Sequence, residues 1–190
     1  MSNAPAKRYI SAQELLEDSF RLAVNIFNSG YRPRLIVGIW RGGSPVGIAV
    51  QEYYEYRGVS TDHIAIRTAS YTGINRQSKT IRVHGLEYIV EHSSRDDPLL
   101  LVDDVFDTGR SMEAVLQTLS DLSGGDCRDR VRIACPWFKP ANNRTRLVPD
   151  YHLHETDAWL VFPHELAGLT REEIAAGKPE LARILDAGKT

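Results

Sequence analysis

Residues 99–111, with the sequence LLLVDDVFDTGRS, hold the densest group of chemically useful side chains in the chain. An apolar run ends in two adjacent carboxylates, Asp103 and Asp104, and a third, Asp107, follows after two apolar residues. Like charges repel, so three acids crowded at the end of a strand are costly unless a ligand uses them. Carboxylates accept hydrogen bonds from sugar hydroxyls and also bind hard divalent cations.

The residues after the third acid predict a phosphate site. Thr108, Gly109, Arg110 and Ser111 follow Asp107 directly and lead into a helical pattern. They supply hydroxyls, backbone amides and a cation at the start of a helix, where the unpaired N–H groups and the helix dipole attract anions. Together with the carboxylates, they predict a pocket for a sugar phosphate.

A second glycine-containing turn could bind another anion. Arg41, Gly42 and Gly43 follow an apolar run, and Pro45 marks the first turn of a predicted helix. The glycines let backbone amides approach a ligand closely, and the Arg41 guanidinium is a forked donor. This signal is weak alone, because a strand-to-helix turn without a ligand also uses glycines. Neither common nucleotide motif, GxGxxG or GxxxxGK[ST], is present here.

Predicted helices and strands alternate along the chain. Apolar runs and β-branched residues predict strands over residues 35–39, 63–67, 99–102, 131–135, 151–153 and 159–161. Capping and helical spacing predict helices over residues 11–29, 44–56, 86–92, 111–122, 171–176 and 180–187. Residues 68–80 are polar with little periodicity, so we predict a mobile loop there.

This alternation favours an α/β fold, with a mostly parallel central sheet flanked by helices. In such folds the functional site lies beyond the carboxyl ends of the strands. We therefore expect the important residues to follow Val37, Ile66, Val102 and Cys135.

Composition excludes several classes of protein. The 190 residues suit one domain, and 23 basic against 25 acidic residues argue against a generally basic nucleic-acid binder. No apolar run approaches the ~20 residues of a membrane span, and residues 1–10 lack a secretion signal, so we expect a cytoplasmic protein without a membrane span. Cys127 and Cys135 are expected to be free thiols.

The segment 99–111 resembles the binding signature for phosphoribosyl diphosphate (PRPP) of the type I phosphoribosyltransferases. That signature is an apolar strand, two acids, two apolar residues and Asp-Thr-Gly. The turn at Arg41, Gly42 and Gly43 resembles the pyrophosphate loop of this family, and Ser70 and Tyr71 resemble its flexible lid. The resemblance covers about residues 35–165, whereas dehalogenase-type and receiver-type acidic motifs fit less well.

The resemblance implies roles for these residues. Asp107 would be the general base, and Asp104 would contact Mg²⁺, directly or through water. The other PRPP-binding residues would be Arg41, Gly42, Gly43, Ser70, Tyr71, Asp103, Asp104, Thr108, Gly109, Arg110 and Ser111.

Residues in the carboxyl-terminal third of the chain predict which nucleobase the protein would bind. Lys139 follows the strand 131–135, where 6-oxopurine enzymes place a lysine for the 6-oxo group, and Trp159 would stack on the purine. The backbone of Leu160 could read the purine 2-position. These residues resemble bacterial and archaeal hypoxanthine and xanthine–guanine enzymes, so the implied activity is transfer of phosphoribosyl to hypoxanthine, guanine or xanthine.

Two alternatives stay open: an enzyme for another base, and a PRPP-sensing regulator of the same fold. We expect a single domain over residues 1–190, with a PRPP-binding core at about 35–135. A small base-binding hood would span about 136–165, and the N-terminal segment could contribute to it. Family members commonly form dimers or tetramers, so a homo-oligomer is expected.

Overall fold

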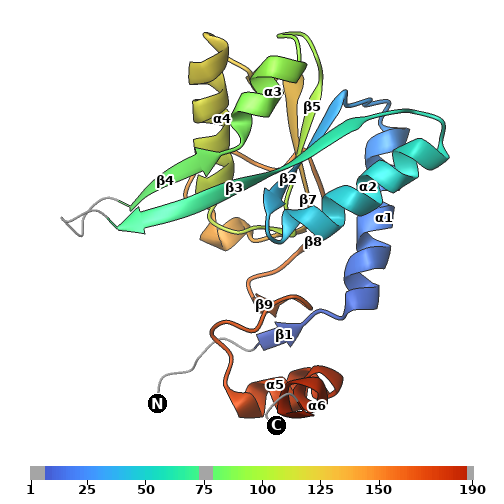
Figure 1. Ribbon diagram of the computed structural model, residues 1–190, viewed down its shortest axis with the longest axis vertical. Helices are drawn as coiled ribbons and strands as arrows, with labels where there is room; N and C mark the ends of the chain where they lie inside the picture. Colours follow the sequence, from blue (N-terminus) through green and yellow to red (C-terminus); the bar gives the residue numbers. More distant parts are fainter. Residues whose placement is uncertain (1–6, 73–78, 188–190) are drawn as a thin grey trace. The chain divides into compact units, whose positions relative to one another are not determined.

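The computed structural model describes residues 7–72 and 79–187, and Figure 1 shows how the chain is folded. The chain divides into two compact units. The larger is Gln13–Asp157, and the smaller combines the described parts of Met1–Ala12 and Ala158–Thr190. Each unit is described by itself.

A seven-stranded sheet forms the centre of the larger unit. Its strands lie in the order β4-β3-β2-β5-β7-β6, with β8 also paired to β7, and only β3 and β4 are antiparallel. The strands are β2 (Leu35–Trp40), β3 (Asp62–Thr72), β4 (Lys79–His84), β5 (Leu99–Val102), β6 (Val105–Phe106), β7 (Val131–Phe138) and β8 (Tyr151–Glu155). The predicted α/β fold with a mostly parallel sheet is confirmed.

Helices cover both faces of this sheet. In Figure 1, α1 (Ala12–Asn28) and α2 (Gly43–Tyr56) lie on one side, and α3 (Leu86–His92) and α4 (Arg110–Ser123) lie on the other. All four residues of β5 are fully buried, which is why its sequence is a continuous apolar run rather than an alternating one. Buried side chains of β2, β5 and β7 pack with those of α3 and α4 in one cluster.

The smaller unit is held together by a short parallel pair of strands and two helices. In it β1 (Lys7–Tyr9) pairs with β9 (Trp159–Val161), and α5 (Arg171–Gly177) and α6 (Pro179–Ala187) follow. Thr170 and Glu173 form a capping box at the start of α5, and Glu173 also forms an ion pair with Lys7 of β1. The Lys178 ammonium, between the helices, donates to the backbone carbonyl of Glu165 at 2.6 Å.

Most predicted elements are confirmed, but the mobile loop predicted over residues 68–80 is wrong in part. β3 continues to Thr72 and β4 begins at Lys79, so the two form an antiparallel hairpin; residues 73–78 lie outside the described part of the chain. Beyond Arg67, β3 pairs with β4 and no longer with β2. The part of the β3–β4 pair that extends beyond β2 buries few side chains, so its sequence does not need the apolar residues of a core strand.

Two short strands, β1 and β6, were not predicted, because two or three residues carry no detectable periodicity. β7 also continues to Phe138, three residues beyond its predicted end. Across the described residues, the structure contains no helix that is both long and apolar enough to cross a membrane. Both cysteines are free, as predicted, and the structure shows that both are buried.

Candidate active site

The register of the central strands brings two loops to the same edge of the sheet. Gly38 of β2 lies opposite Val102 of β5, and Val102 lies opposite Ala134 of β7. The Asp103 amide then donates to the Ala134 carbonyl at 3.1 Å, so the acidic residues begin where regular pairing ends. The predicted location at the carboxyl ends of the strands is therefore correct for these two loops.

Gly42 and Gly43, in the loop after β2, lie where there is no room for a side chain. A Cβ atom on Gly43 would lie 2.1 Å from the Val102 carbonyl oxygen, and one on Gly42 would lie 2.0 Å from a carboxylate oxygen of Asp104. Real Cβ atoms essentially never come closer than 3.0 Å to such neighbours. The glycines therefore allow the loop after β2 to lie directly against the acidic end of β5.

The two adjacent acids have an unusual electrostatic environment. Burial and the neighbouring Asp104 carboxylate raise the pKa of Asp103 well above its usual range. The amides of Asp104 and Gly43 donate to the Asp103 carboxylate and partly oppose that shift. Asp104 is itself buried, with 7% of its surface exposed. Such a pair is suited to a ligand that supplies hydroxyl donors or positive charge.

Two helices begin at this edge, and both point their amino ends into it. α2 begins after Gly42 and α4 after Gly109, and neither of these residues has a side chain that could cap its helix. The Gly43 amide, at the start of α2, donates to the Asp103 carboxylate. The first N–H groups of a helix have no partner within the helix, so uncapped ends can bind anions. The Ser44 hydroxyl, in the first turn of α2, is buried and has no hydrogen-bond partner among the described residues. The arrangement provides two anion sites beside the two carboxylates.

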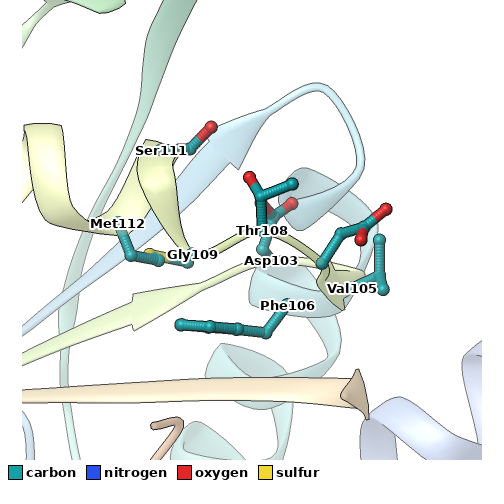
Figure 2. A pocket seen from close by; sticks show the side chains of 8 residues that line it. Asp103, Val105, Phe106, Thr108, Gly109, Ser111 and Met112 are labelled. Atoms are coloured by element: carbon teal, nitrogen blue, oxygen red, sulfur yellow. The ribbon is translucent and has the colours of Figure 1, made fainter. Parts of the chain in front are cut away.

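A small pocket lies at the start of α4. It is lined by Asp103 and by residues of the segment that follows: Val105, Phe106, Asp107, Thr108, Gly109, Ser111 and Met112. Figure 2 shows the Thr108 hydroxyl and the Asp103 carboxylate on the same side of the Phe106 ring, with Ser111 on the first turn of the helix. Gly109 has φ +77°, and a Cβ there would lie 2.5 Å from the Thr145 hydroxyl. Glycine is therefore required both by conformation and by space.

Asp107 and Lys139 lie close together. The Lys139 ammonium is 3.4 Å from Asp107 Oδ2. Lys139 is buried, with 8% of its surface exposed. A lysine has three donor hydrogens, and this contact uses at most one of them. Asn142, which the sequence analysis did not identify, donates from Nδ2 to Asp107 Oδ1 at 2.9 Å.

The donor set suits Mg²⁺ better than a transition metal. Asp103 and Asp104 offer hard carboxylate oxygens, and the described residues contain no cluster of three or more metal-ligating side chains. Mg²⁺ is commonly held by one or two carboxylates together with the phosphates of a substrate. The residues therefore fit a Mg²⁺ ion that arrives with a phosphorylated ligand.

The predicted base-stacking residue belongs to the smaller unit. Trp159, in β9, has 51% of its surface exposed, and the Lys7 ammonium lies 5.5 Å from its ring centroid. Its ring is therefore not part of a hydrophobic core. Leu160, the next residue, is buried.

The structure thus brings most of the predicted residues of the larger unit together: the turn at Arg41, the pair at Asp103, the segment 107–109, Ser111 and Lys139. Arg110 is the exception, because it lines a separate pocket with Ile81 and Glu113. Ser70 and Tyr71 have their backbone in β3, but their side chains lie outside the described part of the structure. Sequence analysis missed Ser44 and Asn142. The only signal for Ser44 was its place after two glycines, and no local pattern identified Asn142.

Comparisons with known proteins agree with this geometry. The model of the phosphoribosyl transferase domain family matches residues 6–167. No curated protein sequence matches the chain significantly.

Several solved structures have the same fold. A purine phosphoribosyltransferase from Pyrococcus horikoshii is 26% identical, with a TM-score of 0.65, over 86% of this chain and 97% of the other. A xanthine-guanine-hypoxanthine phosphoribosyltransferase from Helicobacter pylori is 19% identical, with a TM-score of 0.66, over 93% and 99%. A Neisseria gonorrhoeae protein with bound ppGpp is also 19% identical, with a TM-score of 0.69, over 98% and 99%.

Proposed function

The chain belongs to the phosphoribosyl transferase domain family, and from this premise we propose that it transfers the 5-phosphoribosyl group of PRPP to a 6-oxopurine. The acceptor would be hypoxanthine, guanine or xanthine, and the products would be the nucleoside monophosphate and pyrophosphate. The activity would serve purine salvage. The P. horikoshii structure, which is titled a purine phosphoribosyltransferase, supports the purine assignment.

One observation carries the proposal: two helix amino ends, each preceded by a glycine, lie beside a pair of adjacent carboxylates at one edge of the sheet. PRPP carries a 5′-phosphate, a pyrophosphate and two ribose hydroxyls between them. Two anion sites beside acceptors for hydroxyl groups match this set of chemical groups.

The proposed binding mode follows from these matches. The 5′-phosphate would bind Thr108, Gly109, Arg110 and Ser111 at the start of α4, and Asp103 and Asp104 would accept hydrogen bonds from the ribose hydroxyls. Arg41 and the amides of Gly42 and Gly43 would bind the pyrophosphate at the start of α2, with the Gly43 amide exchanging its bond to the Asp103 carboxylate for one to the ligand. The buried Ser44 hydroxyl is a further candidate. Fixing both ends of the substrate positions ribose C1 for reaction.

The reaction exchanges one bond at C1 for another. The bond from C1 to the pyrophosphate oxygen breaks with its electron pair leaving on pyrophosphate, and a purine ring nitrogen forms the new bond to C1. The Arg41 guanidinium and the neutral N–H donors at the start of α2 would stabilise the leaving group as its charge grows. Asp107 accepts the proton that the purine loses, which we assign to N7.

Mg²⁺, when bound, neutralises charge on the pyrophosphate, and Asp104 is the residue that we propose to hold it, directly or through water. Lys139 would donate to the purine 6-oxo group, because its buried ammonium has hydrogens left to donate. For the smaller unit, the family resemblance alone assigns Trp159, which is exposed, to stacking on a purine and the Leu160 backbone to its 2-position.

The initial rate of nucleotide formation tests the proposal. The protein is mixed with PRPP, Mg²⁺ and one base at a time, namely hypoxanthine, guanine, xanthine, adenine, uracil or orotate, and compared with Asp107→Asn and Lys139→Ala. We expect product from at least one 6-oxopurine, and large losses of rate in both variants.

The other results would identify an alternative. A preference for adenine or a pyrimidine would favour an enzyme for another base, and full activity of Lys139→Ala with 6-oxopurines would remove the support for that class of base. Binding of PRPP without product from any base would favour a PRPP-sensing regulator. The cytoplasmic location and the dimer or tetramer stay predictions.

A further inference from the structure

The carboxylate of Asp107 has two described partners, one on each oxygen. Asn142 Nδ2 donates to Oδ1 at 2.9 Å, which is an ordinary hydrogen-bond length. The Lys139 ammonium approaches Oδ2 at 3.4 Å, which is long for a charged pair. The two oxygens are therefore not equivalent, because Oδ1 is firmly held and Oδ2 is not.

The backbone around Asn142 fixes that hydrogen bond in place. Asn142 ends a short 3₁₀ turn, Pro140–Asn142, and its amide donates to the Lys139 carbonyl at 3.1 Å. On one side of the turn, the Lys139 amide donates to the Phe106 carbonyl at 2.9 Å. On the other, the Arg144 amide donates to the Thr108 carbonyl at 3.0 Å.

These two backbone bonds bracket Asp107, since Phe106 and Thr108 are its immediate neighbours in sequence. Two backbone bonds and two contacts between side chains thus join the turn to the acidic loop. Of the two side-chain contacts, the one from Asn142 is the shorter, at 2.9 Å against 3.4 Å for Lys139. The carboxylate of Asp107 remains 42% exposed, so without Asn142 the side chain would be free to rotate. The turn presents Asn142 at a position where it can prevent this rotation.

We propose that Asn142 is a positioning residue for the general base: it holds Oδ1 of Asp107 so that Oδ2 faces the purine. This inference rests on the proposed function. Asn142 itself touches neither substrate nor product in this account. Its amide is a neutral donor, and a donor to an ionised carboxylate stabilises the charged form that a general base needs.

The charged neighbours of the Asp107 carboxylate cannot take the positioning role of Asn142. Lys139 approaches Oδ2, the oxygen that must accept the proton, and we assign its remaining hydrogens to the purine 6-oxo group. Asp103 lines the same pocket, but no described hydrogen bond joins its side chain to Asp107. Asn142 is therefore the described partner that stabilises the charge without occupying the reactive oxygen.

Two substitutions test the inference. Asn142→Ala removes the donor, and Asn142→Asp keeps the size of the side chain but replaces the donor with an acceptor that becomes negatively charged. Asn143→Ala is the matched control, because it removes the same residue type from the same loop. The Asn143 side chain bonds to Leu147 and Thr145, and no described bond joins it to Asp107.

The readout is the pH dependence of kcat/KM for the purine, with KM for PRPP and the melting temperature measured beside it. We expect Asn142→Ala to lower kcat by about ten-fold, the effect of one hydrogen bond to a charged group. The acid limb, where the base takes up a proton, should move to higher pH because a donor to the carboxylate is lost. Asn142→Asp should move it further, while KM for PRPP changes less than about two-fold, since the phosphate sites are untouched.

The control separates positioning from folding. Asn143→Ala is expected to leave the acid limb where it lies in the wild type, whatever its effect on stability. An acid limb that is unchanged in both Asn142 variants, or that moves equally in Asn143→Ala, would overturn the inference while leaving the proposed function intact. A wild-type protein that makes no nucleotide from any base would instead count against the proposed function.

Discussion

Replacing Gly42 with alanine should damage PRPP binding without unfolding the protein. Gly42 has φ −66° and ψ −32°, a conformation that alanine adopts without strain. The three heavy atoms nearest to the added Cβ all belong to the Asp104 carboxylate, with Oδ2 at 2.0 Å and Cγ at 2.2 Å. The main chain can therefore stay in place while the Asp104 side chain has to move.

The size of that movement gives the expected effect. Non-bonded heavy atoms settle at about 3.5 Å, so Oδ2 must retreat by more than about 1 Å. A misplacement of about 1 Å in a group that orients substrate can cost about 100-fold in rate. We therefore expect kcat/KM for PRPP to fall about 100-fold, which corresponds to about 2.7 kcal/mol of transition-state stabilisation.

The assay is steady-state kinetics with PRPP varied at saturating Mg²⁺ and purine, together with thermal melting. Gly47→Ala is the matched control, since it lies in the same helix and its Cβ would meet nothing closer than 3.8 Å. Because glycine is unfavourable inside a helix, Gly47→Ala should keep its activity and gain about 0.5–1 kcal/mol of stability.

Normal kinetics for Gly42→Ala would refute this reasoning, because they would mean that the position of the Asp104 carboxylate is irrelevant to PRPP. Equal losses of activity in Gly42→Ala and Gly47→Ala would also refute it, since the effect would then come from the helix and not from Asp104.

Three further predictions concern other parts of the chain. The pKa of Asp103 is raised in the folded state, so its contribution to folding becomes less favourable as pH rises above the usual range of an aspartate. Asp103→Asn should therefore raise the melting temperature at pH 8 but not at pH 4. An equal change at both pH values would contradict the raised pKa of Asp103. Trp159→Ala should raise KM for the purine by about ten-fold or more through the loss of stacking, with KM for PRPP unchanged in the same kinetic series. Leu101→Ala, in the fully buried β5, should lower the free energy of unfolding by about 2–5 kcal/mol in a denaturant titration, and a loss below 1 kcal/mol would show that β5 is not central to the core.

Much of the site could be predicted because its chemistry is local in sequence. The apolar run of β5 identifies a buried strand, and in a parallel sheet the residues after such a strand lie at the functional edge. Asp103 and Asp104 follow β5 directly, and the turn at Gly42 and Gly43 follows β2, so their positions follow from those strands alone. The same logic places Lys139 after the predicted strand 131–135, which the structure extends to Phe138.

Other features depend on contacts between residues that are distant in sequence. Asn142 matters only because the turn after β7 is joined to the loop after β6, which sequence spacing does not reveal. The parallel pair of β1 and β9 joins segments about 150 residues apart in three-residue strands, too short for a periodic signal. The sequence predicts a loop instead of the β3–β4 hairpin because the hairpin extends beyond β2 and needs few apolar residues.

Calorimetric titration of PRPP with Mg²⁺ into the wild-type protein tests the central claim most directly, since every proposed role depends on PRPP binding at the edge formed by residues 41–44 and 103–111. We predict saturable binding of one PRPP per chain, strongly weakened in Gly42→Ala and retained in Gly47→Ala. A folded wild-type protein that binds no PRPP would contradict the account.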